Sequence, residues 1–392
     1  MSLENNQDRI SSFDELDINE NLLRGVYGYG FEKPSAIQQL AIKPIQSGKD
    51  IIAQAQSGTG KTGAFLISSM SKVDKHVHEP QVLILAPTRE LAIQIYNNAV
   101  GFNLYTKFDI CLLIGGNDHN NVAVASGVDS KFREDCHIVI GTPGKIYFML
   151  NKHYLRTSSL KILCIDEADE MLNSCFKEQL YDIFQFIPTN TQVCLFSATI
   201  TAETLDLSNK FMNNPSRILV NNEELTLEGI KQFYVNVEEE RFKYETLADI
   251  YKFLNINQTI IYCNSKKKTQ QIHQRLESNN FTVSCIHSDM SQQERNKVLT
   301  EFRKGSIRIL LATDIIARGI DVQQVSTVIN FDLPLKKEVY IHRIGRSGRY
   351  GRKGLAINFV TIHDFNYLKQ IESFYGTLIE PFPDPEHLDN LF

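Results

Sequence analysis

The sequence lacks an excess of positive charge, a long apolar run and an N-terminal segment that resembles a signal or transit peptide. Its 41 lysines and arginines are outnumbered by 46 aspartates and glutamates, which gives a formal net charge of −5. A uniformly basic coat for nucleic acid is therefore excluded, and any contact with nucleic acid has to use local basic patches. No apolar run approaches the roughly 20 residues of a membrane span. The first 20 residues carry six acids and one base, the opposite of a signal or transit peptide, so we expect a cytoplasmic or nuclear protein.

The cysteines are too scattered for a metal or redox motif. None of the seven forms a C-x-x-C pair, and several lie in apolar runs, such as Cys164 between Leu163 and Ile165. Such cysteines are usually buried, reduced thiols. We therefore expect neither a zinc site nor a catalytic cysteine.

Short apolar runs alternate with longer helical segments along all 392 residues, a length that suits two domains. Several runs are continuously apolar, which is typical of parallel strands covered on both faces. The pattern predicts two open α/β sheets in tandem. The expected strands are 51–53, 82–86, 138–140, 162–165 and 193–196, followed by 260–263, 283–286, 309–312, 328–331 and 356–360.

A polar stretch separates the two series of strands. Residues 211–215 end a helix at a proline, and residues 221–228 are polar. A second polar stretch, 117–136, is expected to be a surface loop. The predicted organisation is an acidic N-terminal extension at 1–20, a first domain at 21–216, a linker at 217–228 and a second domain at 229–392.

A loop of small residues lies between the first expected strand and a helical run. Backbone N–H groups at the start of such a helix bind phosphate. Lys61 would reach the β- and γ-phosphates, and the Thr62 hydroxyl would hold Mg²⁺. The general pattern has glycine where Ala55 stands, and a ligand-free turn is the alternative interpretation. The loop consists of Ala55, Gln56, Ser57, Gly58, Thr59, Gly60, Lys61 and Thr62.

Carboxylates follow the expected strand 162–165 in the order Asp166-Glu167-Ala168-Asp169. The C-terminal end of a parallel strand lies where ligands bind. Asp166 there suits Mg²⁺ held through water, and Glu167 can polarise an attacking water. Alone, the segment could be a solvated acidic turn, but together with the phosphate loop it indicates a nucleotide-hydrolysing site.

The Asp-Glu-Ala-Asp segment and the order of the segments around it resemble the DEAD-box ATP-dependent RNA helicases, and within them the initiation factor 4A and 4A-III subfamily. The resemblance covers residues 12–376. It implies two RecA-like parallel-sheet domains in tandem, the superfamily 2 helicase core, with ATP and Mg²⁺ as ligands.

The resemblance assigns adenine recognition to residues 30–38. Phe31 offers a ring face to the base, and Gln38 offers an amide to its N6/N7 edge. An ordinary core role for Phe31 is the alternative. Asp321 would bind the ribose, and Tyr350 would close on the other face of the adenine.

Short loops at strand ends match the family's RNA-binding motifs. Such loops suit the sugar-phosphate backbone without base reading, although each could also be a plain turn. Lys145 stands where the family usually has arginine, and it lacks the planar fork of arginine. The RNA-binding residues that the resemblance implies are Pro87, Arg89, Gly115, Gly116, Thr142, Gly144, Lys145, Asn264, Arg295, Thr313 and Arg318.

Residues that link ATP to RNA are also implied. Ser197 and Thr199 would bond Asp169, with capping of the next helix by Thr199 or Thr201 as the alternative. The resemblance also implies that His342 helps to couple ATP to RNA. Residues 336–353 hold seven bases and one acid. Arg346 and Arg349 within them resemble arginine fingers for the transferring phosphate, with a plain basic surface helix as the alternative.

Two functions fit these residues. The first is an RNA-stimulated ATPase that hydrolyses ATP to ADP and phosphate and locally unwinds mRNA in translation initiation. The second is an ATP-dependent clamp on RNA of the exon-junction type, in which case a nuclear location is expected. Expected partners are single-stranded RNA and a scaffold protein of the initiation-factor or exon-junction type, bound to a monomeric motor. A motor acting on DNA is disfavoured.

Overall fold

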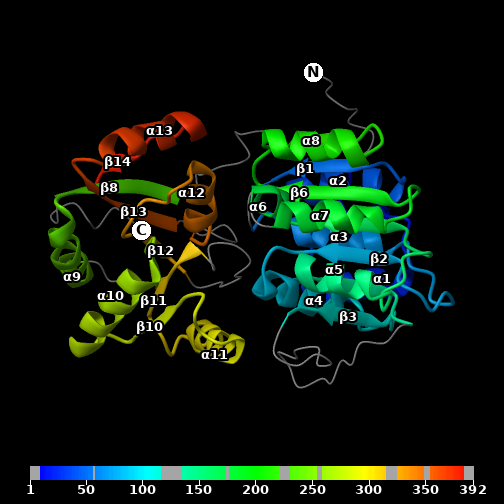
Figure 1. The fold of residues 1–392 in the computed structure, drawn as a ribbon, viewed down its shortest axis with the longest axis horizontal. Helices are drawn as coiled ribbons and strands as arrows, with labels where there is room; N and C mark the ends of the chain where they lie inside the picture. Colours follow the sequence, from blue (N-terminus) through cyan, green and yellow to red (C-terminus); the bar gives the residue numbers. More distant parts are fainter. Residues whose placement is uncertain are drawn as a thin grey trace. The chain divides into compact units, whose positions relative to one another are not determined.

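The computed structural model describes residues 9–55, 58–115, 135–173, 176–219, 230–253, 258–314, 325–347 and 354–383. The chain forms two compact units, residues 1–224 and 225–392 (Figure 1). Among the described residues, no helix is both long enough and apolar enough to span a membrane.

The first domain is built on a seven-stranded sheet with the order β3-β4-β2-β5-β6-β1-β7, in which all neighbouring strands are parallel. The strands are β1 (Ile51–Gln54), β2 (Val82–Leu85), β3 (Ile110–Leu113), β4 (Ile138–Gly141), β5 (Ile162–Ile165), β6 (Gln192–Ser197) and β7 (Ser216–Leu219). The helices are η2 (Phe13–Glu15), α1 (Glu20–Gly28), α2 (Ala36–Gln46), α3 (Lys61–Met70), α4 (Arg89–Phe102), α5 (Pro143–Asn151), α6 (Ala168–Asn173), α7 (Phe176–Gln185) and α8 (Ala202–Phe211).

Each face of this sheet has its own hydrophobic core. Successive strand residues point to opposite faces, so Ile51 and Ala53 join the core shared with α1 to α4, whereas Ile52 joins the core shared with α5 to α8. Burial on both faces explains why these strands are continuously apolar. Phe13, within the predicted N-terminal extension, is fully buried in the first of these cores.

The second domain repeats this architecture with the order β10-β11-β9-β12-β13-β8-β14, again with parallel neighbours. The strands are β8 (Ile230–Glu238), β9 (Thr259–Tyr262), β10 (Val283–Ile286), β11 (Ile309–Ala312), β12 (Thr327–Asn330), β13 (Gly354–Thr361) and β14 (Glu380–Pro381). The helices are η4 (Glu240–Phe242), α9 (Lys243–Phe253), α10 (Lys266–Ser278), α11 (Gln292–Arg303), α12 (Lys337–Ile344) and α13 (Phe365–Tyr375). Alternating strand residues again feed two cores, one with α11 to α13 and one with α9 and α10.

Side-chain caps fix where several helices begin. The Thr88 hydroxyl accepts a hydrogen bond from the N–H of Leu91 at the start of α4. Ser291 and Glu294 form a reciprocal capping box at the start of α11. Because a cap satisfies otherwise unpaired N–H groups, these residues set the exact point at which each strand-to-helix loop ends.

The ten expected strands are all present, and the prediction of two parallel α/β sheets is confirmed. Strands β3, β7, β8 and β14 were not predicted. In β8, Lys231, Gln232 and Asn236 interrupt the apolar residues, so its apolar run is limited to residues 233–235. β7 includes residues 217–219, which the polar pattern had assigned to the linker. The rest of that linker, residues 220–228, and most of the expected loop 117–136 lie outside the described residues.

Most of the cysteines that the structure describes are buried, as expected of reduced thiols. Cys111, Cys136, Cys164, Cys194 and Cys263 are free and buried, and Cys285 is half-buried. Cys136 closes the predicted surface loop, yet its side chain is fully enclosed.

Candidate functional site

The phosphate loop begins where β1 ends and leads directly into α3. Gly58 and Gly60 have φ values of 87° and 100°, a region that favours glycine. Ala55, by contrast, is not among the residues with positive φ. It is fully buried, and its N–H donates to the carbonyl of Ser197. Glycine is therefore not needed at this position. Gln56 and Ser57 lie outside the described residues.

Lys61 and Glu167 meet beside this loop. Lys61 is the first residue of α3 and is only 5% exposed. Its Nζ lies 3.6 Å from Oε1 of Glu167, and it has no hydrogen-bond partner within the described part of the chain. A buried ammonium without a hydrogen-bond acceptor fits an anionic ligand such as a phosphate. Thr62 follows on the same turn and is half-buried.

Asp166 and Glu167 directly follow strand β5, as the sequence predicts. Both are buried, and the Glu167 N–H donates a 3.0 Å hydrogen bond to Asp166 Oδ1. Burial raises the pKa of Asp166 to about 7; the Lys61 ammonium opposes this rise, and the Glu167 carboxylate adds to it. Two close buried carboxylates repel each other when both are charged. A cation such as Mg²⁺ held at Asp166 would relieve that repulsion, so these residues fit the metal that the sequence implies.

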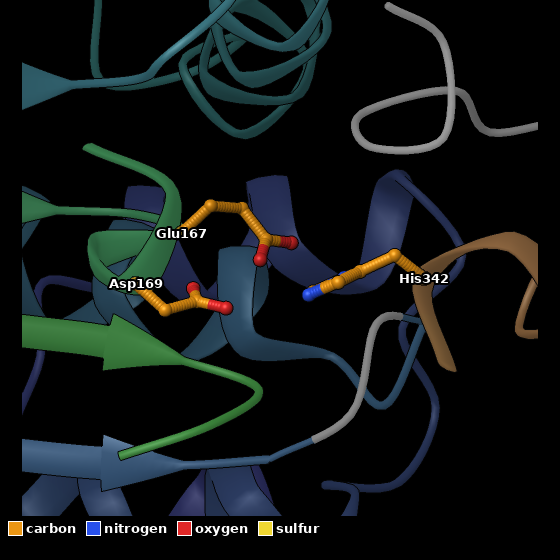
Figure 2. Close-up of side chains that lie close together, drawn as sticks. All are labelled: Glu167, Asp169 and His342. Atoms are coloured by element: carbon orange, nitrogen blue, oxygen red, sulfur yellow. The ribbon is translucent and has the colours of Figure 1, made fainter. Parts of the chain in front are cut away.

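Asp169 lies one turn further along the chain, on α6. It is 1% exposed, and both its carboxylate oxygens accept hydrogen bonds. The donors are the hydroxyls of Ser197 (2.7 Å) and Thr199 (3.0 Å). Thr201, not Thr199, caps α8. Figure 2 shows the carboxylates of Glu167 and Asp169 extending to the same side of their turn. His342, also drawn there, belongs to α12 of the second domain and is fully buried.

The predicted adenine readers lie against the phosphate loop. Gln38 is 2% exposed; its Oε1 accepts from the Ser35 N–H, and its Nε2 donates to the Gly60 carbonyl at 3.0 Å. A Cβ on Gly63 would come within 2.7 Å of the Phe31 ring and 2.5 Å of Gln38 Nε2. A side chain at position 63 would therefore push Phe31 and Gln38 away from the start of α3.

Phe31 packs against the first-domain core and remains partly exposed. Its ring centroid lies 5.2 Å from that of Phe102 and 6.2 Å from that of Tyr29. Packing thus holds the ring while part of it stays accessible. Asp321 and Tyr350, the other predicted nucleotide contacts, lie outside the described residues.

The first-domain residues predicted to bind RNA gather at one edge of the sheet, because they follow the adjacent strands β3, β4 and β2. Arg89 begins α4, and its Nη2 lies about 3.1 Å from where a Cβ of Gly115 would be. Thr142 stands at the N-cap position of α5, and Gly144 lies in the first turn of that helix. Pro87 is buried and shapes its loop.

Lys145 has a neighbour that the sequence pattern did not reveal. Its Nζ lies 5.2 Å from the centre of the Phe148 ring, and Phe148 is exposed. The ring attracts the ammonium and so orients Lys145, which stands where the family usually has arginine. Gly116 lies outside the described residues.

Asn264 of the second domain is held inside the fold. Its Oδ1 accepts from Arg343 Nη2 at 2.8 Å, and its Nδ2 donates to the Leu333 carbonyl at 2.7 Å. Its side chain therefore organises the domain, and contact with RNA would fall to other atoms of this loop. Arg295 is mostly buried and donates to Gln292. Thr313 is half-buried, and Arg318 lies outside the described residues.

Arg343 is the organising residue that the sequence did not single out. It is fully buried and, besides Asn264, it donates to Asp314 Oδ1 at 2.6 Å and to the Asp332 carbonyl at 2.7 Å. It thus ties together the loops after β9, β11 and β12. Its only sequence signal is that it lies between the apolar residues Ile341 and Ile344. Arg346, the predicted finger, is 3% exposed, and its Nε donates to the His342 carbonyl; Arg349 lies outside the described residues.

Comparisons with known proteins agree with this geometry. The DEAD/DEAH box helicase family model matches residues 35–207, and the helicase conserved C-terminal domain model matches residues 242–351. The chain is 53% identical over 384 residues to an ATP-dependent RNA helicase eIF4A of Candida glabrata, covering 97% of this chain and 95% of the relative. It is 51% identical over 383 residues to eukaryotic initiation factor 4A of Caenorhabditis elegans, covering 97% and 94%.

A solved structure extends the likeness to three dimensions. Dbp5 of Saccharomyces cerevisiae, bound to RNA and ADP BeF3, matches with a TM-score of 0.88 and 33% identity over 97% of both chains. Both domains are thus of the RecA-like kind expected. The chain belongs to the DEAD-box family of ATP-dependent RNA helicases and, within it, to the eIF4A type.

Proposed function

We propose that the chain is an RNA-stimulated ATPase that locally unwinds mRNA during translation initiation in the cytoplasm. The observation that carries this proposal is the buried set of Lys61, Asp166 and Glu167 beside a phosphate loop to which Gln38 is bonded. The names of the relatives favour translation initiation over the exon-junction alternative.

The roles of the first-domain residues follow from their chemistry. Lys61 binds the β- and γ-phosphates, and Glu167 orients the attacking water and accepts its proton. Gln38 and Phe31 select adenine. Thr62 and Asp166 would hold Mg²⁺, largely through water, and the ion would neutralise charge on the phosphates when bound.

RNA coupling is assigned to residues outside the nucleotide site. The loops that carry Arg89, Thr142 and Lys145 bind the sugar-phosphate backbone. Ser197 and Thr199 join Asp169 of the nucleotide segment to the loop after β6. Arg346 and Arg349 stabilise charge on the transferring phosphate. Because these arginines and the phosphate loop belong to different domains, RNA that binds both domains would favour the hydrolysing state.

The test measures ATP turnover by the full chain with no nucleic acid, with single-stranded RNA and with single-stranded DNA of the same sequence. We expect strong stimulation by RNA and weak stimulation by DNA, together with RNA-duplex unwinding that needs ATP hydrolysis. Equal stimulation by DNA would contradict the RNA assignment. Turnover that an added scaffold protein arrests, with RNA trapped, would instead support a clamp.

A further inference from the structure

A cavity in the second domain is lined mostly by residues to which no ATP or RNA contact is assigned; Asn264 is the exception. It has a volume of about 700 Å³ and lies where β8, β12 and β13 end. That volume is within the range of sites that hold a ligand or a peptide segment. Its wall includes Leu335 and Ile362, which follow β12 and β13.

Three lining residues, Glu240, Lys243 and Asp332, belong to an ionic cluster. Asp332 Oδ1 lies 3.0 Å from Lys243 Nζ and 2.7 Å from Lys268 Nζ. Both ammonium groups also pair with Glu240, at 2.8 Å and 2.6 Å. The charges of this cluster are therefore matched within the domain, and a ligand would meet a preformed surface.

The rim of the cavity keeps a surplus of negative charge. Glu238 has no ion-pair partner among the described residues, and Glu239 pairs only with Arg241 in an exposed contact. Asp364 adds a further carboxylate at the start of α13. Phosphates of RNA would be repelled here, whereas lysine or arginine side chains would be attracted.

Apolar side chains stand beside these acids. Leu335 is 79% exposed, the largest fraction among the large apolar side chains of the described residues, and Ile362 is 67% exposed. Tyr367 also lines the cavity, and its hydroxyl is shielded from solvent without a hydrogen-bond partner in the described part of the chain. Covering Leu335 and Ile362 would bury apolar surface.

We propose that this cavity is the docking site for a segment of a partner protein that carries basic side chains next to an aliphatic one. The basic side chains face Glu238 and Glu239, and the aliphatic one covers Leu335 and Ile362. β12 neighbours β9 in the sheet, so the docked segment lies beside the loop of Asn264. The inference rests on the proposed function and names the surface that the expected scaffold partner would bind.

The test uses the full chain and a fluorescent peptide of alternating arginine and leucine, read by anisotropy. Peptides of alternating glutamate and leucine, and of alternating arginine and serine, serve as comparisons. We expect the arginine–leucine peptide to bind most tightly. The pairs Glu238→Lys with Glu239→Lys, and Leu335→Ser with Ile362→Ser, should each weaken its binding about tenfold.

Matched variants outside the cavity separate docking from general charge and hydrophobicity. Glu245→Lys with Glu277→Lys reverses two exposed acids on α9 and α10, and Leu378→Ser removes another exposed leucine. These variants should bind the arginine–leucine peptide as the parent chain does. RNA-stimulated ATP turnover should be unchanged in every variant, which distinguishes failure of docking from failure of the proposed helicase function.

Hydrogen exchange supplies an independent readout. The peptide should protect residues 238–240 and 361–364 of the full chain. Equal weakening by the matched variants, protection elsewhere, or displacement of the peptide from this site by oligouridylate would overturn the proposal.

Discussion

The side-chain amide of Gln38 donates a 3.0 Å hydrogen bond to the backbone carbonyl of Gly60. The proposed adenine reader is therefore bonded to the phosphate loop itself. Recognition of the base and the conformation of the loop share one buried amide, because the Gln38 side chain is 2% exposed. Loss of this amide should affect both functions.

Gln38→Ala should weaken ATP binding and erode the preference for ATP over GTP. The lost bond to Gly60 alone is worth about 1 kcal/mol, so affinity should fall several-fold for both nucleotides, with an additional loss for ATP only. Titration of the two nucleotides measures this. Gln46→Ala, on the same helix and bonded to Ser71, is the control. An unchanged ATP-to-GTP ratio would remove Gln38 from adenine recognition.

Glu167→Gln should stop hydrolysis while ATP and RNA still bind. The amide keeps the shape of the side chain but accepts no proton, so turnover should fall by about 10²–10⁴. Single-turnover kinetics and RNA binding with ATP present are the measurements. Glu178→Gln, an exposed substitution on α7, should leave both unchanged. Normal turnover in Glu167→Gln would mean that another group activates the water.

Ser197→Ala should destabilise the first domain and reduce stimulation by RNA. The buried Asp169 carboxylate loses one of its hydroxyl donors, which costs about 1–3 kcal/mol. Urea unfolding measures the loss, and the ratio of turnover with and without RNA measures the coupling. Thr201→Ala removes the cap of α8 at a cost of about 1 kcal/mol and should spare the coupling. If Thr201→Ala changed the ratio of turnover with and without RNA as much as Ser197→Ala does, the Ser197 contact would have only a structural role.

Asp332 should contribute a pH-dependent part of the stability of the second domain. Burial works to raise its pKa, but the Asn264 N–H and the ammonium groups of Lys243 and Lys268 lower it overall. A pKa lowered by folding stabilises the protein above the ordinary aspartate pKa, and this contribution disappears as the pH falls through the folded value.

Asp332→Asn should therefore lower the free energy of unfolding by about 2 kcal/mol near neutral pH. The variant's free energy of unfolding should also decrease less as the pH is lowered. Urea unfolding of the full chain across pH values measures both changes. Asp289→Asn is the matched control, because Asp289 also has a lowered pKa but pairs with Lys266 on the surface. Such exposed pairs contribute little, so an equal loss in both variants would contradict the role of burial.

Local sequence predicts the central strands and the nucleotide segments because each is defined by neighbouring residues. Strand β5 is a continuous apolar run, and the carboxylates that follow it necessarily stand at its C-terminal end. The phosphate loop is recognised in the same way. Strand β8 was missed because polar residues such as Lys231 and Asn236 interrupt its apolar ones, and its pairing with β13 depends on contacts between distant segments.

The second domain shows where local sequence is insufficient. Asn264 resembles an RNA contact, but its side chain is held by Arg343, 79 residues away. Lys268 looks like a solvated cation, but it pairs with Asp332 and Glu240. In each case the partner is brought close only by the order of strands in the sheet, which no nearby residue reveals.

Each of the four hydrophobic clusters draws its described residues from one domain only. The two domains thus have separate interiors, so we expect calorimetry of the intact chain to resolve two melting transitions. A nucleotide that contacts Lys61 and Gln38 alone would shift one of them and leave the other in place. The width and spacing of those transitions would then report directly on which ligands join the halves into a single cooperative unit.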